Sequence, residues 1–479
     1  MKFKKNYFFW VVVLFISTYG YSQVGIGTTS PDESALLDVS STTQGLLAPR
    51  MSTAQRLAIT DPAKGLLVFD NNESVFYFYD GTSWLPVKGA EKRDNYKLVK
   101  SVADLADELV VGGGSKYILN SDYMYEINGT ILFDFPIDLN GAYIEGHDTG
   151  EDILVNNSGT TLFSGTKGGR LKDILINGNN QQVFDITGGP SESIIGYSVV
   201  ITGASSLGVL SNLNVVFFSV LQVVNTSDGL DISDIKSFFV QNVFWTETNE
   251  GTFLDVSGDF DNFQMANGRV VTDINEIGID VSLNPTINIS GSLSEISFAG
   301  DGERIKGYTA NTYSGYNFST DWDVNCSGVP LEKDSNATGD INLNYPIGFG
   351  ATTTFTGTGS TSRLKLLGDT TSNNLFRFSR SGNNRIVYEG NKSRYFNIST
   401  SLSFRGSNNN AIFVFYLAKN GSVVEETRVY REIGSNNDIG AVAVIGTIEL
   451  APTDYIEVWA ERYSGNGNLL TVSLNLIAK

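Results

Sequence analysis

The sequence predicts an all-β protein: a right-handed β-solenoid (β-helix) followed by a C-terminal β-sandwich, with short helices confined to the N-terminal region. Between Tyr123 and Cys326, short runs of Val, Ile, Leu and Phe recur about every 20–25 residues, separated by Gly, Asn, Asp and Ser. Helical periodicity is almost absent there. After residue 345, strand-like runs alternate with turn signals. The predicted parts are a signal peptide (1–22), an N-terminal module with a β-hairpin (23–94), a solenoid (95–344) and a head (345–479).

The first 22 residues have the layout of a secretory signal peptide. Three lysines precede an apolar run over residues 7–16, and small and polar residues follow it. The apolar run is too short to span a bilayer. We therefore expect cleavage before Gln23 and a chain that is secreted or displayed at the cell surface, without membrane insertion.

The N-terminal module has clear local signals. Ser52 and Gln55 form a capping box, which predicts a helix that ends before Pro62. Residues 65–79 predict a β-hairpin, and the Asp-Gly pair that follows turns the chain towards Trp84.

Four motifs of this module carry a family resemblance: residues 24–31 (VGIGTTSP), 35–39 (ALLDV), 45–51 (GLLAPRM) and 79–84 (YDGTSW). Together they resemble a module of exported Bacteroidetes surface proteins and of phage tail-fibre-like and adhesive-fibre proteins. The resemblance implies an attachment module that leads into a fibre shaft, and it implies no chemistry.

The solenoid prediction depends on how the apolar runs would be buried. In a solenoid, each coil packs its apolar side chains only against the neighbouring coils. Residues 101–109 predict a short amphipathic helix that covers the first coil. A β-sandwich meander remains the alternative. The clearest strand-like runs are residues 152–156, 173–177, 183–187, 197–202, 213–224, 238–245 and 253–257.

The charge of the chain lies in the predicted solenoid. Basic and acidic residues number 9 and 9 in residues 1–94, 11 and 33 in residues 95–344, and 13 and 10 in residues 345–479, which gives the net charge of −19. A strongly acidic middle excludes nucleic-acid binding by that part. It also keeps a long protein soluble.

The head contains a strand that is apolar on both faces. Residues 411–418 form this strand, and Asn420 and Gly421 predict a hairpin turn after it. An antiparallel sheet normally exposes one face to water. We therefore expect the row of Phe413, Phe415 and Leu417 to be covered by a symmetric partner, as a trimer interface.

A later strand of the head places two aromatic side chains on its outer face. Tyr455 and Trp459 point outward among glutamates, while Ile456, Val458 and Ala460 point to the core. The two outward side chains are interpreted as a subunit-interface anchor or as a ligand platform, and both interpretations remain open.

The head also resembles a known family. Residues 395–398, 415–421 and 453–458 are similar to the trimeric jelly rolls of the tumour-necrosis-factor and complement-globular-head type. The resemblance implies a jelly-roll sandwich, a homotrimer and a recognition surface, and it transfers no binding residue.

Most catalytic chemistry is excluded by composition. Cys326 is the sole cysteine, which excludes an internal disulfide. His147, the sole histidine, lies in a predicted turn, and no motif surrounds Cys326, which argues against Ser-His-Asp and Cys-His catalysis. A transition-metal site requires more His or Cys ligands than this chain contains. We therefore expect no enzyme activity and no cofactor.

Two alternatives involve the acidic solenoid. A polysaccharide hydrolase would use paired carboxylates, with Asp255, Asp259 and Asp261 as candidates. Calcium is the second option, because the oxygen-rich turns around Asp228, Asp231 and Asp234 suit a hard cation.

The predicted function is that of a non-enzymatic, secreted cell-surface adhesin or fibre. Its homotrimeric head would bind a surface glycan or protein. The alternatives are a tailspike-like polysaccharide hydrolase acting on the solenoid and a purely structural fibre subunit.

Overall fold

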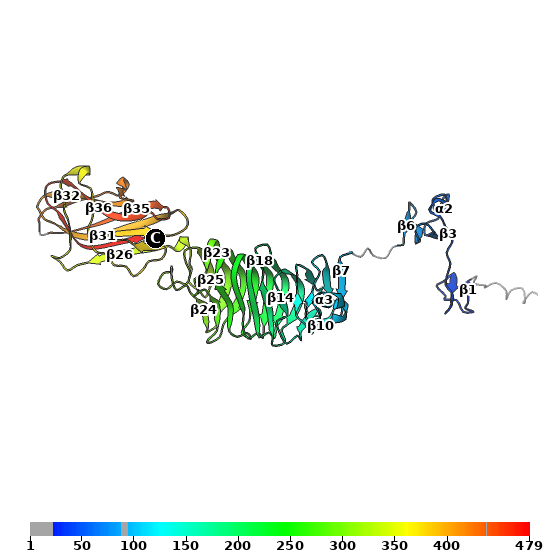
Figure 1. Cartoon of the computed structure of the whole chain (residues 1–479). Coiled ribbons are helices and arrows are strands. Elements are labelled where there is room, and N and C mark those ends of the chain that lie inside the picture. Colours follow the sequence, from blue (N-terminus) through cyan, green and yellow to red (C-terminus); the bar gives the residue numbers. More distant parts are fainter. Residues whose placement is uncertain (1–22, 88–93, 437) are drawn as a thin grey trace, which may run out of the picture. The chain divides into compact units, whose positions relative to one another are not determined.

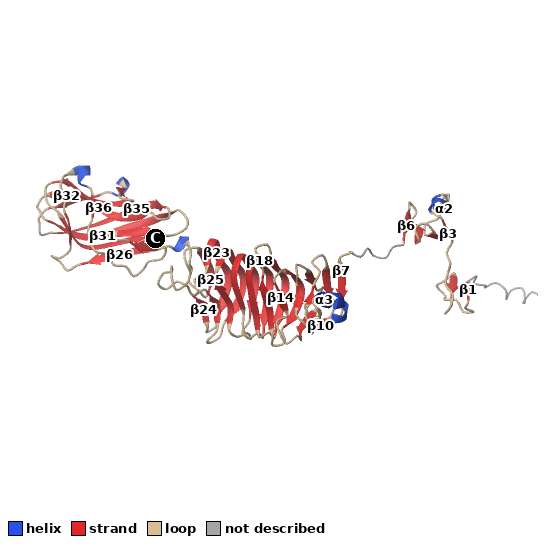
Figure 2. Cartoon of the chain, in the orientation of Figure 1, coloured by secondary structure: helices blue, strands red, loops and turns tan. Residues whose placement is uncertain are grey.

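A computed structural model describes residues 23–87, 94–436 and 438–479, and nearly all regular structure in them is β-strand (Figures 1 and 2). The predicted signal peptide lies outside the described residues. The chain divides into two compact units, one up to Asp94 and one from Asn95 onward. Among the helices that the structure describes, none has the length and apolar character needed to cross a bilayer.

The first unit contains the predicted helix and hairpin. Helix α2 (Thr53–Leu57) begins at the Ser52 capping box. Strands β4 (Leu67–Asp70), β5 (Val75–Tyr79) and β6 (Trp84–Pro86) are antiparallel. A buried ion pair between Arg56 and Asp70 (2.9 Å) holds the helix against β4. The remaining strands are β1 (Val24–Ile26), β2 (Leu37–Val39) and β3 (Arg50–Met51).

Strands β7 to β25 form a β-solenoid, in which each strand pairs in parallel with its counterparts in the preceding and following coils (Figure 1). This pairing confirms the solenoid and excludes the meander. A 3₁₀ turn (Val102–Leu105) and helix α3 (Ala106–Val111) cover the first coils through the buried Leu105. The strands are β7 (Tyr96–Val99), β8 (Tyr117–Ile118), β9 (Met124–Ile127), β10 (Thr130–Phe133), β11 (Ile137–Asp138), β12 (Tyr143–Glu145), β13 (Ile153–Asn156), β14 (Phe163–Gly165), β15 (Gly169–Asn177), β16 (Gln182–Thr187), β17 (Ser193–Thr202), β18 (Ser206–Val224), β19 (Leu230–Trp245), β20 (Thr252–Ser257), β21 (Asp259–Val271), β22 (Ile277–Asp280), β23 (Thr286–Ala299), β24 (Glu303–Lys306) and β25 (Trp322–Ser327).

The solenoid core is one continuous apolar cluster that extends from Val99 to Val324. Like residues stack from coil to coil, and Phe238 and Phe263 lie 4.8 Å apart between ring centroids. Corners between faces are made by left-handed residues in equivalent positions of successive coils, such as Asn242 and Asn267 (φ 53° and 62°). Asn tolerates this conformation, which explains why polar residues interrupt the apolar runs.

The head is a sandwich of two antiparallel sheets with the predicted jelly-roll character. One sheet has the order β26-β37-β31-β35, with β27 paired to β37. The other has the order β29-β30-β36-β32-β33, with β28 paired to β36 and β34 to β32. The strands are β26 (Gly339–Asn344), β27 (Ala351–Thr353), β28 (Leu364–Lys365), β29 (Phe378–Arg380), β30 (Arg385–Tyr388), β31 (Arg394–Gly406), β32 (Ala411–Lys419), β33 (Ser422–Val423), β34 (Val429–Ile433), β35 (Ile439–Leu450), β36 (Tyr455–Ser464) and β37 (Leu469–Ala478), with 3₁₀ turns at Asp334–Asn336, Gly359–Ser362 and Glu425–Thr427.

The prediction that a row of β32 side chains forms the trimer interface is wrong. Phe413, Phe415 and Leu417 are each 0% exposed and belong to the core between the two sheets of one subunit. They are therefore unavailable to a partner chain.

The opposite face of β32 is also covered by the same chain, which explains its apolar pattern. The Arg363 guanidinium lies 5.0 Å from the centre of the Tyr416 ring, and the Tyr416 hydroxyl donates to Glu461 Oε2 (3.0 Å). Arg363 also forms ion pairs with Glu461 and Glu425. A strand apolar on both faces thus reflects cover by its own chain on both sides.

Candidate functional site

Three aspartates form a row along one outer face of the solenoid. Asp231 on β19 pairs in register with Asp255 on β20, and Asp255 pairs with Asp280 on β22. Lys306 on β24 comes next in the same register. Neighbouring strands lie about 4.8 Å apart. Since each aspartate lies between buried apolar residues of its strand, all three side chains point away from the core.

The surroundings of the three carboxyl groups shift their pKa values in different directions. Partial burial, followed by the nearby charges of Asp231 and Asp280, raises the pKa of Asp255 to about 6. Partial burial and the charge of Asp228 also raise the pKa of Asp231. Although burial opposes it, hydrogen bonding to Lys306 Nζ (2.8 Å) and Ser282 lowers the pKa of Asp280.

A protonated carboxyl beside an ionised one is the combination that glycoside hydrolysis requires. Asp255 would be the proton donor, because its pKa is the more strongly raised. Asp280 would be the base or nucleophile on the neighbouring strand. The row is therefore a candidate acid–base pair.

The structure brings only one of the three predicted hydrolase residues into this row. Asp259 and Asp261 follow a turn at Gly258 (φ 75°) and lie on β21, which pairs with β19 and β23, whereas Asp255 lies on β20, which pairs with β19 and β22. Asp261 accepts a hydrogen bond from Asn288 (3.2 Å). The predicted set of Asp255, Asp259 and Asp261 is thus not one site.

The sequence contains a signal for the carboxylate row that the predicted hydrolase residues do not use. The triplets Leu-Asp-Ile (230–232), Leu-Asp-Val (254–256) and Ile-Asp-Val (279–281) are separated by 24 and 25 residues, which is one coil each. An aspartate that repeats with the coil period must stack on itself.

Two of the three predicted calcium ligands, Asp228 and Asp234, accept hydrogen bonds from backbone amides, whereas Asp231 belongs to the carboxylate row. Asp228 Oδ1 accepts hydrogen bonds from the amides of Gly229 and Thr252 (both 3.0 Å). Asp234 Oδ1 accepts from the amide of Asp259 (3.1 Å). Within residues 23–87, 94–436 and 438–479, no group of three or more His, Cys, Asp or Glu is arranged to hold a metal ion.

The two aromatic candidates of the head lie on the outer face of the β36 sheet and are partly buried. Trp459 Nε1 donates to Glu457 Oε2 (2.8 Å). The Arg385 guanidinium lies 4.0 Å from the centre of the Tyr455 ring. Their role as interface or ligand platform remains a prediction. His147, on an exposed turn, donates its amide to Asp152 (2.6 Å).

The outer face of the β26-β37-β31-β35 sheet is different in character. Along β35 it presents Ile439, Ala441, Ala443 and Ile445, which pair with Arg405 and a run of serines on β31. Ile445 is 69% exposed. The described charged residues of this face are Asp340, Arg405 and Glu449, and they lie at its margins. The described side chains at the centre of the face are uncharged.

Comparisons with known proteins cover different parts of the chain. Residues 25–101 match a family described as a phage tail like trimerisation region. No curated protein matches. Among solved structures, murine APRIL is 12% identical, with a TM-score of 0.21, and the match covers 30% of this chain and 99% of that chain.

Two phage tailspikes align over most of the chain. The gp49 tailspike of Acinetobacter baumannii bacteriophage Fri1, a capsular polysaccharide depolymerase, is 6% identical, with a TM-score of 0.17 and coverage of 90% and 98% of the two chains. The tailspike of Acinetobacter baumannii phage AM24 is 10% identical, with a TM-score of 0.19 and coverage of 89% and 93%. Because these TM-scores are low, the solenoid and sandwich folds are assigned from the strand pairing of this chain.

Proposed function

We propose that this chain is the subunit of a homotrimeric surface fibre that binds a glycan or protein at a cell surface. The observation that carries the proposal is the order of the parts along the chain, which are the N-terminal module, the solenoid and the head. The match to a trimerisation region covers residues 25–101, which include the first solenoid strand, β7. Trimerisation there would bring the first coils of three chains together. The export signal predicted from residues 1–22 supports a location outside the cell.

Within the head, the uncharged outer face of the β26-β37-β31-β35 sheet fits a subunit interface best. The opposite outer face is covered by ion pairs within the chain, including Glu457 with Arg385 (2.7 Å) and with Lys365 (3.1 Å). The described side chains at the centre of this face are uncharged and carry exposed apolar groups, and each Å² of apolar surface removed from water there would contribute about 25 cal/mol. This face takes the place of the Phe413 row as the proposed head interface.

Two measurements on the chain from Gln23 onward test the trimer. Light scattering coupled to size-exclusion chromatography should give about three times the subunit mass. On a Cys326→Ser background, maleimide should label Ala443→Cys slowly and Ser381→Cys, on an exposed turn, rapidly. A monomeric mass would overturn the trimer. Equal labelling rates in a trimer would overturn only the head interface.

The carboxylate row favours a second function, polysaccharide hydrolysis on the solenoid. The supporting observation is the raised pKa of Asp255 beside the lowered pKa of Asp280. Release of reducing ends from a polysaccharide panel would test it. Asp255→Asn and Asp280→Asn should each abolish the release, whereas Asp259→Asn, off the row, should leave it unchanged.

If the chain is a purely structural fibre subunit, it should show neither ligand binding nor hydrolase activity. If the intact protein is trimeric but binds neither glycans on an array nor cell-surface proteins, and releases no reducing ends, assembly is its remaining role.

A further inference from the structure

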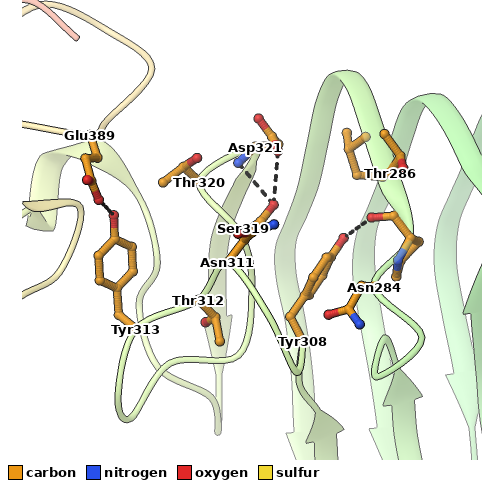
Figure 3. A pocket seen from close by; sticks show the side chains of 12 residues that line it. Asn284, Thr286, Tyr308, Asn311, Thr312, Tyr313, Ser319, Thr320, Asp321 and Glu389 are labelled. Atoms are coloured by element: carbon orange, nitrogen blue, oxygen red, sulfur yellow. Dashed lines mark hydrogen bonds between the residues drawn. The ribbon is translucent and has the colours of Figure 1, made fainter. Parts of the chain in front are cut away.

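A cavity of about 510 Å³ lies beside the last solenoid coils, where they meet the head (Figure 3). Residues 284–287 line one side of the cavity, and residues of the long loop between β24 and β25 line most of the rest. Glu389, just after β30 of the head, closes the far side. The volume is within the range of sites that bind small organic ligands.

Two tyrosines of the cavity are fixed by hydrogen bonds. The Tyr308 hydroxyl donates to the Pro285 carbonyl (2.7 Å) and accepts from Trp322 Nε1 (2.9 Å). The Tyr313 hydroxyl donates to Glu389 Oε2 (2.8 Å), which joins the loop to the head (Figure 3). Because the rings are held before any ligand arrives, binding against them costs little ordering entropy.

The polar groups of the cavity favour a ligand rich in hydroxyl groups. Asp321 accepts one hydrogen bond from Ser319 Oγ (3.1 Å), and both Asp321 and Asn311 are exposed residues of the cavity lining. Carboxylate and amide groups are common acceptors and donors for hydroxyls. Of the twelve described residues that line the cavity, none carries a positive charge, while Asp321 and Glu389 are acidic. A carboxylate- or phosphate-bearing ligand would be repelled.

We propose that this cavity binds one sugar unit without negative charge, neutral or amino-substituted, within a longer glycan. The partly exposed Tyr313 ring would pack against the C–H face of the sugar, and Asp321 and Asn311 would bind its hydroxyls. The proposal rests on the proposed glycan-binding function and gives it a location. That location is neither the carboxylate row nor the aromatic pair of Tyr455 and Trp459.

The test is a glycan array that carries neutral, amino-sugar and uronic-acid glycans, probed with the intact chain from Gln23. Dissociation constants for the strongest hit are then measured by calorimetry. Asp321→Asn and Asn311→Gly remove acceptor and donor groups at the exposed side of the cavity, and Gly keeps the left-handed backbone of Asn311 (φ 59°) without strain. Asp301→Asn, an exposed aspartate outside the cavity, is the matched control. Circular dichroism and thermal unfolding check that all three variants fold.

We expect binding to neutral or amino-sugar glycans, weakened about tenfold by Asp321→Asn and unchanged by Asp301→Asn. If the array is positive but neither cavity variant weakens binding, this inference fails and the proposed function stands. Selective binding of uronic-acid glycans also overturns the inference alone. If the array is silent, the glycan-binding function and the inference fail together.

Discussion

Val220 occupies a backbone conformation that suits it poorly. It stands at a solenoid corner with φ 62°, in the position equivalent to Ser198 and Asn242 of the neighbouring coils. A β-branched residue in this left-handed region is strained by about 1–3 kcal/mol. Asn242 shows which residue type the corner accommodates.

Replacing Val220 with Asn should therefore stabilise the solenoid. We expect a gain of about 1 kcal/mol, measured as a higher midpoint of thermal unfolding of the chain from Gln23. Val209→Asn is the control, because Val209 is partly exposed in an extended part of the same strand, β18, and should lose stability. A lower midpoint for Val220→Asn would show that burial of the valine outweighs its strain.

Asp255 makes stability depend on pH. Its pKa is about 6 in the folded chain, above its ordinary value of 3.8. The stability that its protonated form contributes is complete below about pH 4 and is lost as the pH rises through 6. Asp255→Asn cannot ionise, so it should be more stable than the parent chain at pH 7.5, by about 1–2 kcal/mol, and equally stable at pH 4.

Thermal unfolding at pH 4, 6 and 7.5 measures this difference. Asp259→Asn, in an exposed position off the row, should show no such trend. A constant difference between Asp255→Asn and the parent chain across this range would contradict the raised pKa.

At the scale of elements, the solenoid was predictable because its signals are local. Its apolar runs and polar corners repeat with the coil. Helix α2 of the first unit was predictable because its capping residues mark where it begins. The interface row on β32 was not predictable from local pattern. An apolar second face shows that something covers it, but only the fold reveals that Arg363 and its neighbours in the same chain do so.

The candidate sites differ in the same way. The carboxylate row has a sequence signal, the coil-period aspartate, which becomes visible once the coil length is known. The cavity has none, because it joins residues 284–321 to Glu389 through tertiary contacts. Long-range juxtaposition of this kind leaves no periodic trace.

Phe415 provides the prediction at the element scale. Its ring is fully buried and lies 4.7 Å from the Phe404 ring between centroids. Phe415→Ala should destabilise the head by about 3–5 kcal/mol and leave the subunit number unchanged. Unfolding followed by calorimetry and mass by light scattering separate the two effects. Tyr430→Ala, at 52% exposed, should cost less than about 1 kcal/mol. Loss of trimers with little loss of head stability would restore the interface role.

At the scale of the whole molecule, charge opposes assembly. Residues 95–344 carry 11 basic and 33 acidic side chains, a net −22 for each chain of a trimer. Repulsion among three such chains falls as salt shortens the screening length, from about 30 Å at 0.01 M to about 8 Å at 0.15 M. The thermal midpoint of the assembled chain should therefore rise between 0.01 and 0.15 M NaCl. Calorimetry at constant pH measures the rise, and an equal osmolality of sucrose at low salt is the control for non-ionic effects. A midpoint that falls with salt would mean that ion pairs such as Lys306–Asp280 outweigh the repulsion between solenoids.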